Sequence, residues 1–155
     1  MGAFAMTAIL LAAASPTSTP IEGYWMHPEK TVIIRLEPCG ELVCGTVTWA
    51  TERAQRDARK GVDRLIGARL LTDFRARREG LWKGKIFVPD YDLHVSGKIE
   101  PLDRDRLKVS GCTLGGLLCR TQVWTRTGKP VAGSDQPKAF IWAQSERTIL
   151  AANRR

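Results

Sequence analysis

Two cysteines around a glycine pair constrain the fold of this chain more than any other feature. Cys112 and Cys119 flank Gly115 and Gly116, in a stretch that is otherwise rich in Leu, Val and Thr. Glycine accepts positive φ at little cost, so a glycine pair readily reverses the chain. The pattern predicts two antiparallel strands, over residues 106–112 and 117–126, with the cysteines opposite each other across the turn.

The chain has four cysteines, and Cys39 and Cys44 flank a second predicted turn. Of the three pairings that four cysteines allow, the local one, Cys39–Cys44 with Cys112–Cys119, is favoured because each pair brackets a turn. Zinc is the alternative, but structural zinc ligands usually stand about two to four residues apart. Here four and six residues separate the partners. We therefore predict two disulfides, no metal, no cofactor and an oxidising compartment.

Apolar and polar residues alternate in several segments, as they do in half-buried strands. In residues 43–49 the alternation puts Trp49 on the same face as Gly45 and Val47. About seven strands are predicted, without the regularly intervening helices that parallel sheets require, and the fold class is therefore all-β, an antiparallel barrel or sandwich. The predicted strands cover residues 21–26, 31–37, 43–49, 81–88, 94–100, 106–112 and 117–126.

Basic residues gather between residues 51 and 78. Thr51 is a suitable cap for a short helix after the third strand, and Gly61 could end it. Residues 75–78 are predicted to form a basic loop. A formal net charge of +8 favours acidic partners, although an ordinary solvated surface is the alternative. No nucleic-acid motif is present, so no nucleic acid is expected as partner. The candidate basic surface comprises Arg53, Arg56, Arg59, Lys60, Arg75, Arg77 and Arg78.

The N-terminal residues predict export. Residues 3–14 are nearly all small or apolar, and the run is shorter than the roughly 20 residues that span a membrane. It ends in Ala12-Ala13-Ala14 and is followed by the Pro/Ser/Thr linker 15–20, which is typical of a signal peptide cleaved after Ala14, although no Lys or Arg precedes the run. A disordered apolar terminus is the alternative. The signal peptide places the mature protein in the periplasm or outside the cell.

Motifs at both ends of the predicted sheet resemble known proteins. Gly23-x-Trp25 and Arg126 resemble the lipocalin (calycin) pattern, which implies that Arg126 packs over Trp25 where the first and last strands of a closed barrel meet. The blocks Leu36-Glu-Pro-Cys-Gly40, Trp82-x-Gly-Lys-Ile86 and Gly111-Cys-x-Leu-Gly-Gly-Leu-x-Cys-Arg-Thr-x-x-Trp-Thr-Arg126 resemble family 2147 of the bacterial domains of unknown function. This resemblance implies an exported lipocalin-like barrel over residues 21–127, leaving a tail, 128–155, that could add a strand or short helix.

No catalytic constellation stands out. His27 and His94 lie far apart in the sequence, Asp90 and Asp92 belong to a predicted turn, and no Gly-x-Ser-x-Gly is present. Our first hypothesis is a non-catalytic carrier that binds a small apolar or amphipathic ligand in the bacterial envelope, in a pocket lined by Trp49, Phe87 and Trp124. The alternative is an interaction module, a filled barrel whose basic face docks acidic envelope polymer, anionic lipid or a partner protein.

Overall fold

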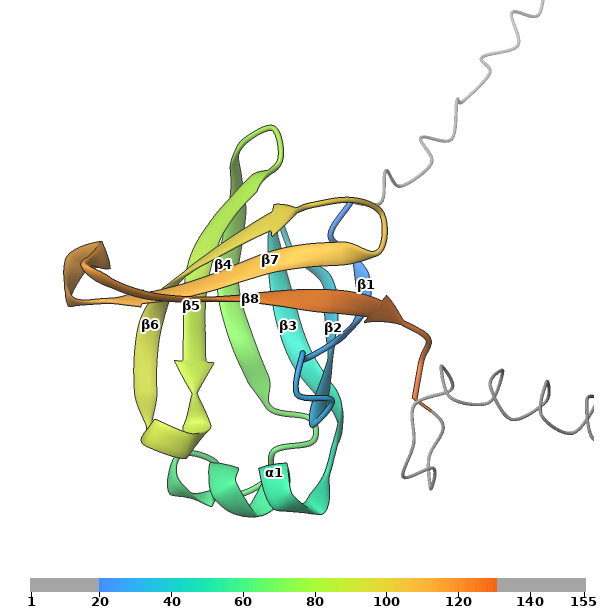
Figure 1. Cartoon of the computed structure of the whole chain (residues 1–155), viewed down its shortest axis with the longest axis vertical. Coiled ribbons are helices and arrows are strands. Elements are labelled where there is room, and N and C mark those ends of the chain that lie inside the picture. Colours follow the sequence, from blue (N-terminus) through green and yellow to red (C-terminus); the bar gives the residue numbers. More distant parts are fainter. Residues whose placement is uncertain (1–19, 131–155) are drawn as a thin grey trace, which may run out of the picture.

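The computed structural model describes residues 20–130. Eight antiparallel strands, each beside its neighbour in sequence, form a closed barrel (Figure 1). The predicted all-β antiparallel barrel is therefore confirmed. The strands are β1 (Gly23–Met26), β2 (Val32–Cys39), β3 (Leu42–Ala50), β4 (Arg69–Arg78), β5 (Leu81–Val88), β6 (Leu93–Pro101), β7 (Arg106–Thr113) and β8 (Leu118–Thr127).

The barrel closes where the first strand meets the last. β1 pairs antiparallel with β8, and Trp25 lies opposite Arg126 in that pairing. On its other edge β1 pairs with β2, where Trp25 lies opposite Ile34. Both edges of this four-residue strand are therefore hydrogen-bonded, which leaves no open sheet edge at the seam.

The segment Arg69–Arg78 departs from our prediction, because it forms strand β4 and not a basic loop. It pairs with β3 on one side and β5 on the other. Asp73 adopts a positive φ of 59° within a register shift between Thr72 and Arg75. This bulge interrupts the alternation of apolar and polar residues, so the strand carries no regular pattern in the sequence.

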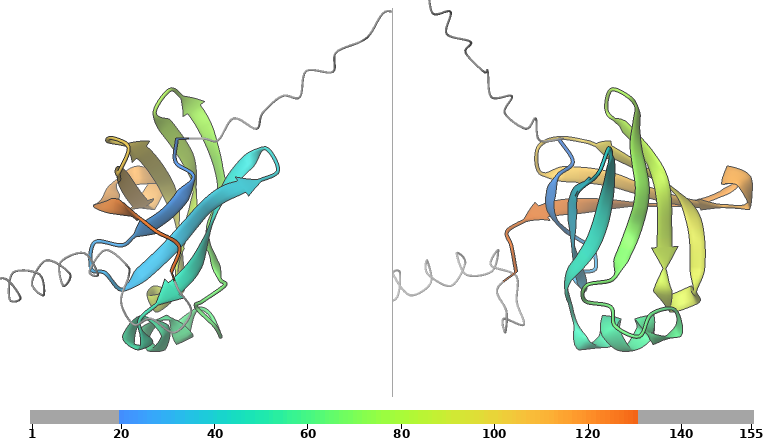
Figure 2. Two further views of the ribbon diagram at one scale, coloured as in Figure 1. Left: turned by 90° about the vertical axis from the view of Figure 1, so that its right-hand side faces the viewer. Right: turned by 180° about the vertical axis from the view of Figure 1, so that it is seen from behind.

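A short helical excursion follows β3, as predicted. It consists of α1 (Glu52–Asp57) and the 3₁₀ turn η1 (Ala58–Lys60). The Thr51 hydroxyl accepts a hydrogen bond from the Ala54 amide over 3.2 Å, which caps α1. The excursion crosses the lower end of the barrel in Figure 1 and keeps that position in both views of Figure 2. Ala58 and Leu65 are buried in the barrel core, so the excursion closes this end.

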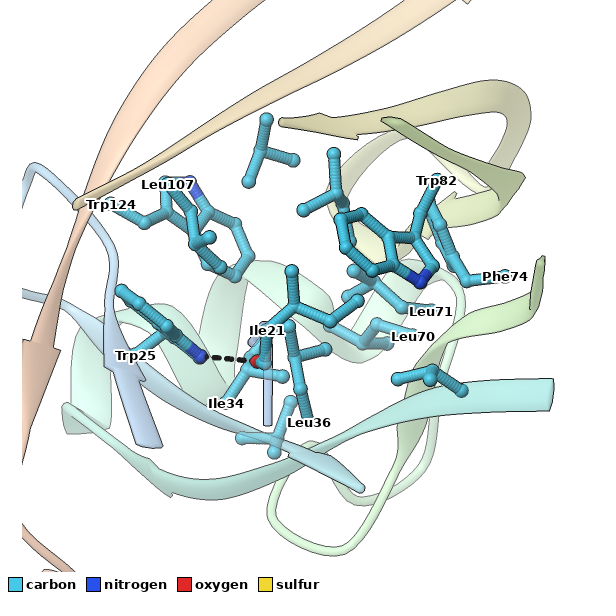
Figure 3. Close-up of a cluster of buried hydrophobic side chains, with 14 of the residues drawn as sticks. Ile21, Trp25, Ile34, Leu36, Leu70, Leu71, Phe74, Trp82, Leu107 and Trp124 are labelled. Atoms are coloured by element: carbon cyan, nitrogen blue, oxygen red, sulfur yellow. Dashed lines mark hydrogen bonds between the residues drawn. The ribbon is translucent and has the colours of Figure 1, made fainter. Parts of the chain in front are cut away.

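The core fills the inside of the barrel and is built around large side chains. Trp25, Phe74, Trp82, Leu107 and Trp124 are each at most 7% exposed and belong to one apolar cluster (Figure 3). Two further 3₁₀ turns lie at strand ends: η2 (Pro89–Tyr91) between β5 and β6, and η3 (Leu114–Gly116) between β7 and β8.

The predicted signal peptide, nearly all of the linker, and residues 131–155 of the predicted tail lie outside the described residues. Within residues 20–130, no helix has the length and apolar character needed to cross a bilayer.

Candidate functional site

The interior of the barrel offers little space at its glycines. A Cβ atom added at Gly84 would lie 2.6 Å from Cδ2 of Phe74, and one added at Gly97 would lie 2.6 Å from Cζ of the same ring. At Gly45 an added Cβ would lie 2.9 Å from Cβ of Leu71. Gly45 therefore leaves no room for a ligand, because neighbouring side chains already occupy the space beside it.

The residues of the Trp/Arg closure lie together at the seam between β1 and β8. The Arg126 guanidinium carbon lies 4.2 Å from the Trp25 ring centroid. Arg126 also donates hydrogen bonds to the carbonyl oxygens of Glu22 and Arg104, over 2.8 and 2.7 Å. Gly23 has a φ of 126°, which residues with a side chain rarely adopt, and a Cβ there would come within 2.5 Å of the Arg126 Nη1 atom, so the position favours glycine.

The three candidate pocket residues lie in different surroundings. Trp124 is buried in the core cluster, and Phe87 packs on the edge of that cluster. A Cβ on Gly61, just after η1, would lie 2.8 Å from Cζ of Phe87, so this ring contacts the helical excursion.

The third residue, Trp49, points to the opposite side of its strand from the one we predicted. Ile34 pairs with Val47 inside the barrel, whereas Ile33 pairs with Trp49, which leaves Thr48 as an extra residue in β3. This bulge reverses the alternation, because consecutive cross-strand pairs face opposite sides of a sheet. Trp49 therefore faces away from the core that holds Trp124.

The two histidines contact different aromatic rings. His27 lies edge-on to Trp124 with ring centroids 5.8 Å apart, and His94 lies 4.5 Å from Phe87. Burial of His27 lowers its pKa below the ordinary value of 6.5, against the opposing effects of Glu29 and Gln122. Among residues 20–130, no group of three or more His, Cys, Asp and Glu side chains could hold a metal ion.

The structure divides the predicted basic surface into two parts. Arg53, Arg56, Arg59 and Lys60 lie on the helical excursion, at the lower end of the barrel in Figure 1. Two of these arginines are paired within α1, Arg53 with Asp57 and Arg56 with Glu52. The second part comprises Arg75, Arg77 and Arg78, which lie near the β4–β5 turn at the upper end.

An outer groove of about 600 Å³ lies across β4, β5 and β6, beneath the turn between β7 and β8. We call it the cationic groove. Four of its lining residues are basic, and Asp73 is its one carboxylate. Asp73 forms an ion pair with Lys85 over 3.2 Å. The lining residues on which our argument depends are Arg77, Lys83, Lys85, Lys98, Gly115 and Gly116.

Strand pairing explains why the cations meet. Lys83 lies opposite Arg75 of β4 on one side and Lys98 of β6 on the other, so three basic side chains form a row across three strands. No ion pair with a carboxylate within residues 20–130 neutralises any of the three. Our sequence interpretation did not include Lys83 and Lys98 in the basic surface. The signal was present, because both alternate with the interior residues Trp82, Gly84, Gly97 and Ile99.

Both local disulfides are present in the structure. Cys39 is bonded to Cys44, and Cys112 to Cys119, with Cα atoms 5.8 and 4.0 Å apart. The second disulfide joins the hairpin formed by β7 and β8, where Cys112 and Cys119 are cross-strand partners. It lies close to the tip of that hairpin and beside the cationic groove, which Cys112 also lines.

A closed barrel of eight antiparallel strands, sealed by an arginine over a Gly-x-Trp tryptophan, defines a lipocalin-like protein. The chain belongs to the family described as "Uncharacterized protein conserved in bacteria (DUF2147)", whose model matches residues 23–126.

Among solved structures, the chain is similar to protein HP1028 from Helicobacter pylori, which is described as belonging to the lipocalin family. The two share 14% identity with a TM-score of 0.57, over 80% of this chain and 88% of that one. At this identity the likeness shows the fold alone. No curated protein matches the chain significantly.

Proposed function

We propose that this protein is a non-catalytic binding protein of the bacterial envelope, and that its ligand is an anion held in the cationic groove. The observation that carries the proposal is the row formed by Arg75, Lys83 and Lys98 across three paired strands. Lys83 and Lys98 line the groove, and Arg75 lies opposite Lys83 at its border. Like charges directly opposite each other destabilise a sheet. A phosphate or carboxylate group bound between them would offset this repulsion and accept charge-assisted hydrogen bonds.

The packing of the barrel favours this proposal over an apolar carrier. The Phe74 ring lies against Gly84 and Gly97, where a hollow barrel would hold its ligand. Trp49, one of the three candidate pocket residues, faces away from the other side chains of the core. The groove instead supports the alternative hypothesis, a filled barrel with a basic binding face. We assign this binding face to the outer side of β4, β5 and β6.

Binding without catalysis is consistent with the chemistry of the groove. Its charged side chains are four cations and Asp73, and that carboxylate is paired with Lys85. Two disulfides support an oxidising compartment, and the apolar N-terminal run supports export. We therefore propose a location in the periplasm or outside the cell.

The proposal is tested by titrating the protein with inorganic tripolyphosphate in a calorimeter. We expect saturable binding that weakens steeply as ionic strength rises, because exposed charges are screened. Lys83→Gln with Lys98→Gln should weaken binding at least about tenfold, since each charge-assisted hydrogen bond contributes about 1.5–3 kcal/mol.

The matched control is Arg59→Gln with Lys60→Gln, which removes two charges from the helical excursion at the other end of the barrel. It should leave tripolyphosphate affinity within about twofold of the unmodified protein, since long-range charge is screened. Equal weakening by both double variants would assign binding to net charge alone and would overturn the groove as the site.

A further inference from the structure

The hairpin formed by β7 and β8 projects from the barrel and ends in exposed leucines. β6 pairs with β7 only as far as Cys112, whereas β7 and β8 remain paired beyond that point, to Thr113 and Leu118. The hairpin therefore leaves the sheet and extends to one side, as Figure 1 shows and as the rear view in Figure 2 confirms.

Three leucines surround the tip of this hairpin, which we define as residues 113–118. Leu114 is 75% exposed, Leu117 is 88% exposed and Leu118 is 66% exposed. A single exposed leucine is ordinary, but three among five consecutive residues form an apolar projection that water does not favour. Such a projection is typical of a surface that another apolar phase covers.

The disulfide below the tip and the backbone conformation of the turn restrict how the tip can move. The Cys112–Cys119 disulfide joins the two strands directly below it. Leu114, Gly115 and Gly116 all have positive φ, at 50°, 68° and 99°. For a leucine this conformation is unfavourable, so it persists only because the surrounding turn fixes it. The leucines are therefore presented on a braced loop, which reduces the entropy lost when they bind.

Positive charge adjoins the leucines. Gly115 and Gly116 line the cationic groove together with Lys83, Lys85 and Lys98, so the apolar tip forms one rim of the cationic site. Residues 106–129, which include the whole hairpin, contain no Asp or Glu. An anionic surface would therefore meet no like charge along the hairpin.

We propose that this hairpin tip docks the protein on an anionic lipid bilayer. Leu114, Leu117 and Leu118 enter the boundary between headgroups and acyl chains, and the cationic groove takes the phosphates of the lipid headgroups. This inference rests on the proposed function and names its ligand. A bilayer fits the observations better than a protein partner does, because the apolar area is small, convex and bordered by cations, as in interfacial membrane anchors.

The test measures partition onto vesicles of phosphatidylcholine with and without phosphatidylglycerol, by sedimentation. The unmodified protein should bind the phosphatidylglycerol vesicles and bind pure phosphatidylcholine weakly. Leu117→Ser should lower the partition coefficient several-fold, and Leu117→Ser with Leu118→Ser by at least about tenfold, because apolar area that enters the membrane is lost. Both positions are exposed, so the fold should be retained.

Leu102→Ser is the matched control, since Leu102 is an exposed leucine of the β6–β7 turn, 46% exposed. It should leave vesicle partition unchanged. Tripolyphosphate affinity, measured on the same samples, should be unchanged in all leucine variants, because none removes a groove cation. These results together would support docking by the tip.

Other outcomes overturn the inference in distinguishable ways. Tripolyphosphate binding without vesicle binding would assign the groove to a soluble anion and leave the proposed function standing. Vesicle binding that the leucine variants do not weaken would make the contact purely electrostatic. Self-association that the double leucine variant abolishes, in place of vesicle binding, would assign the tip to a second copy of the chain. Binding of neither probe would overturn the proposed function as well.

Discussion

A single arginine holds the seam of the barrel through several interactions at once. Arg126 covers the Trp25 ring and donates to three backbone carbonyls of the surrounding segments. Trp25 itself donates its Nε1 hydrogen to the Ile21 carbonyl over 2.9 Å, which fixes the ring that Arg126 covers (Figure 3). The resemblance of Gly23-x-Trp25 and Arg126 to the lipocalin pattern predicted this contact, and the structure confirms it.

Replacement of Arg126 by methionine should lower the free energy of unfolding by about 2–3 kcal/mol, from the loss of a cation–π contact and of hydrogen bonds to carbonyls. Urea denaturation followed by tryptophan fluorescence measures this change. Arg126→Lys should recover only part of the loss, since an ammonium lacks the planar fork. Arg120→Met, an exposed change on the same strand, should stay within about 0.5 kcal/mol. A cost for Arg120→Met equal to that for Arg126→Met would contradict this account.

The elements of the fold differ in how far the sequence could predict them. β6 and β7 alternate regularly, and their register follows from that alternation, whereas Ile33, buried beside Ile34, breaks the alternation of β2. β3 and β4 each contain a bulge, at Thr48 and near Asp73. No local sequence pattern predicts either bulge. The bulges are defined by cross-strand register, with β2 for Thr48 and with β5 for the segment near Asp73, and they decide which way Trp49 and Phe74 point. For this reason the strands were largely predictable and the pocket residues were not.

The hairpin disulfide permits a prediction for a single element. It closes a segment with a sequence separation of 7, so Cys112→Ser with Cys119→Ser should lower the free energy of unfolding by about 2 kcal/mol, on the loop-entropy estimate. Far-UV circular dichroism should show an intact barrel, and urea denaturation should show the loss. The same pair of changes at Cys39 and Cys44, with a separation of 5, should cost about as much. Loss of the barrel signal in the first variant would show that this disulfide is required for the fold.

Within residues 20–130, the charged side chains of the groove and of the helical excursion lie outside the barrel and the apolar core lies inside it. The interior is occupied by large side chains, the cations of the groove face outward, and the exposed leucines gather at one tip. The sequence predicted that basic residues would matter, but it assigned them to one continuous face. Strand pairing instead separates those of the helical excursion from those near the groove, since β4 runs from one end of the barrel to the other.

Phe74 tests whether the barrel is filled. Phe74→Ala should lower the free energy of unfolding by about 3–5 kcal/mol and leave a cavity beside Gly84 and Gly97. The variant should bind an apolar dye such as diphenylhexatriene with increased fluorescence, whereas the unmodified protein should bind it weakly. Leu117→Ala, which removes an exposed side chain and creates no cavity, serves as the control. Stoichiometric dye binding by the unmodified protein would contradict a filled interior and would restore the apolar carrier.

The order of the strands also has a consequence for how the barrel forms. Each strand pairs with its neighbour in sequence except at the contact of β1 with β8, which joins residues about as distant as Glu22 and Arg126, 104 positions apart. Closing a loop of that length costs about 2 kcal/mol more than closing one of about ten residues. Arg126 therefore stabilises the strand pairing that has the largest entropic cost of loop closure, the pairing of β1 with β8.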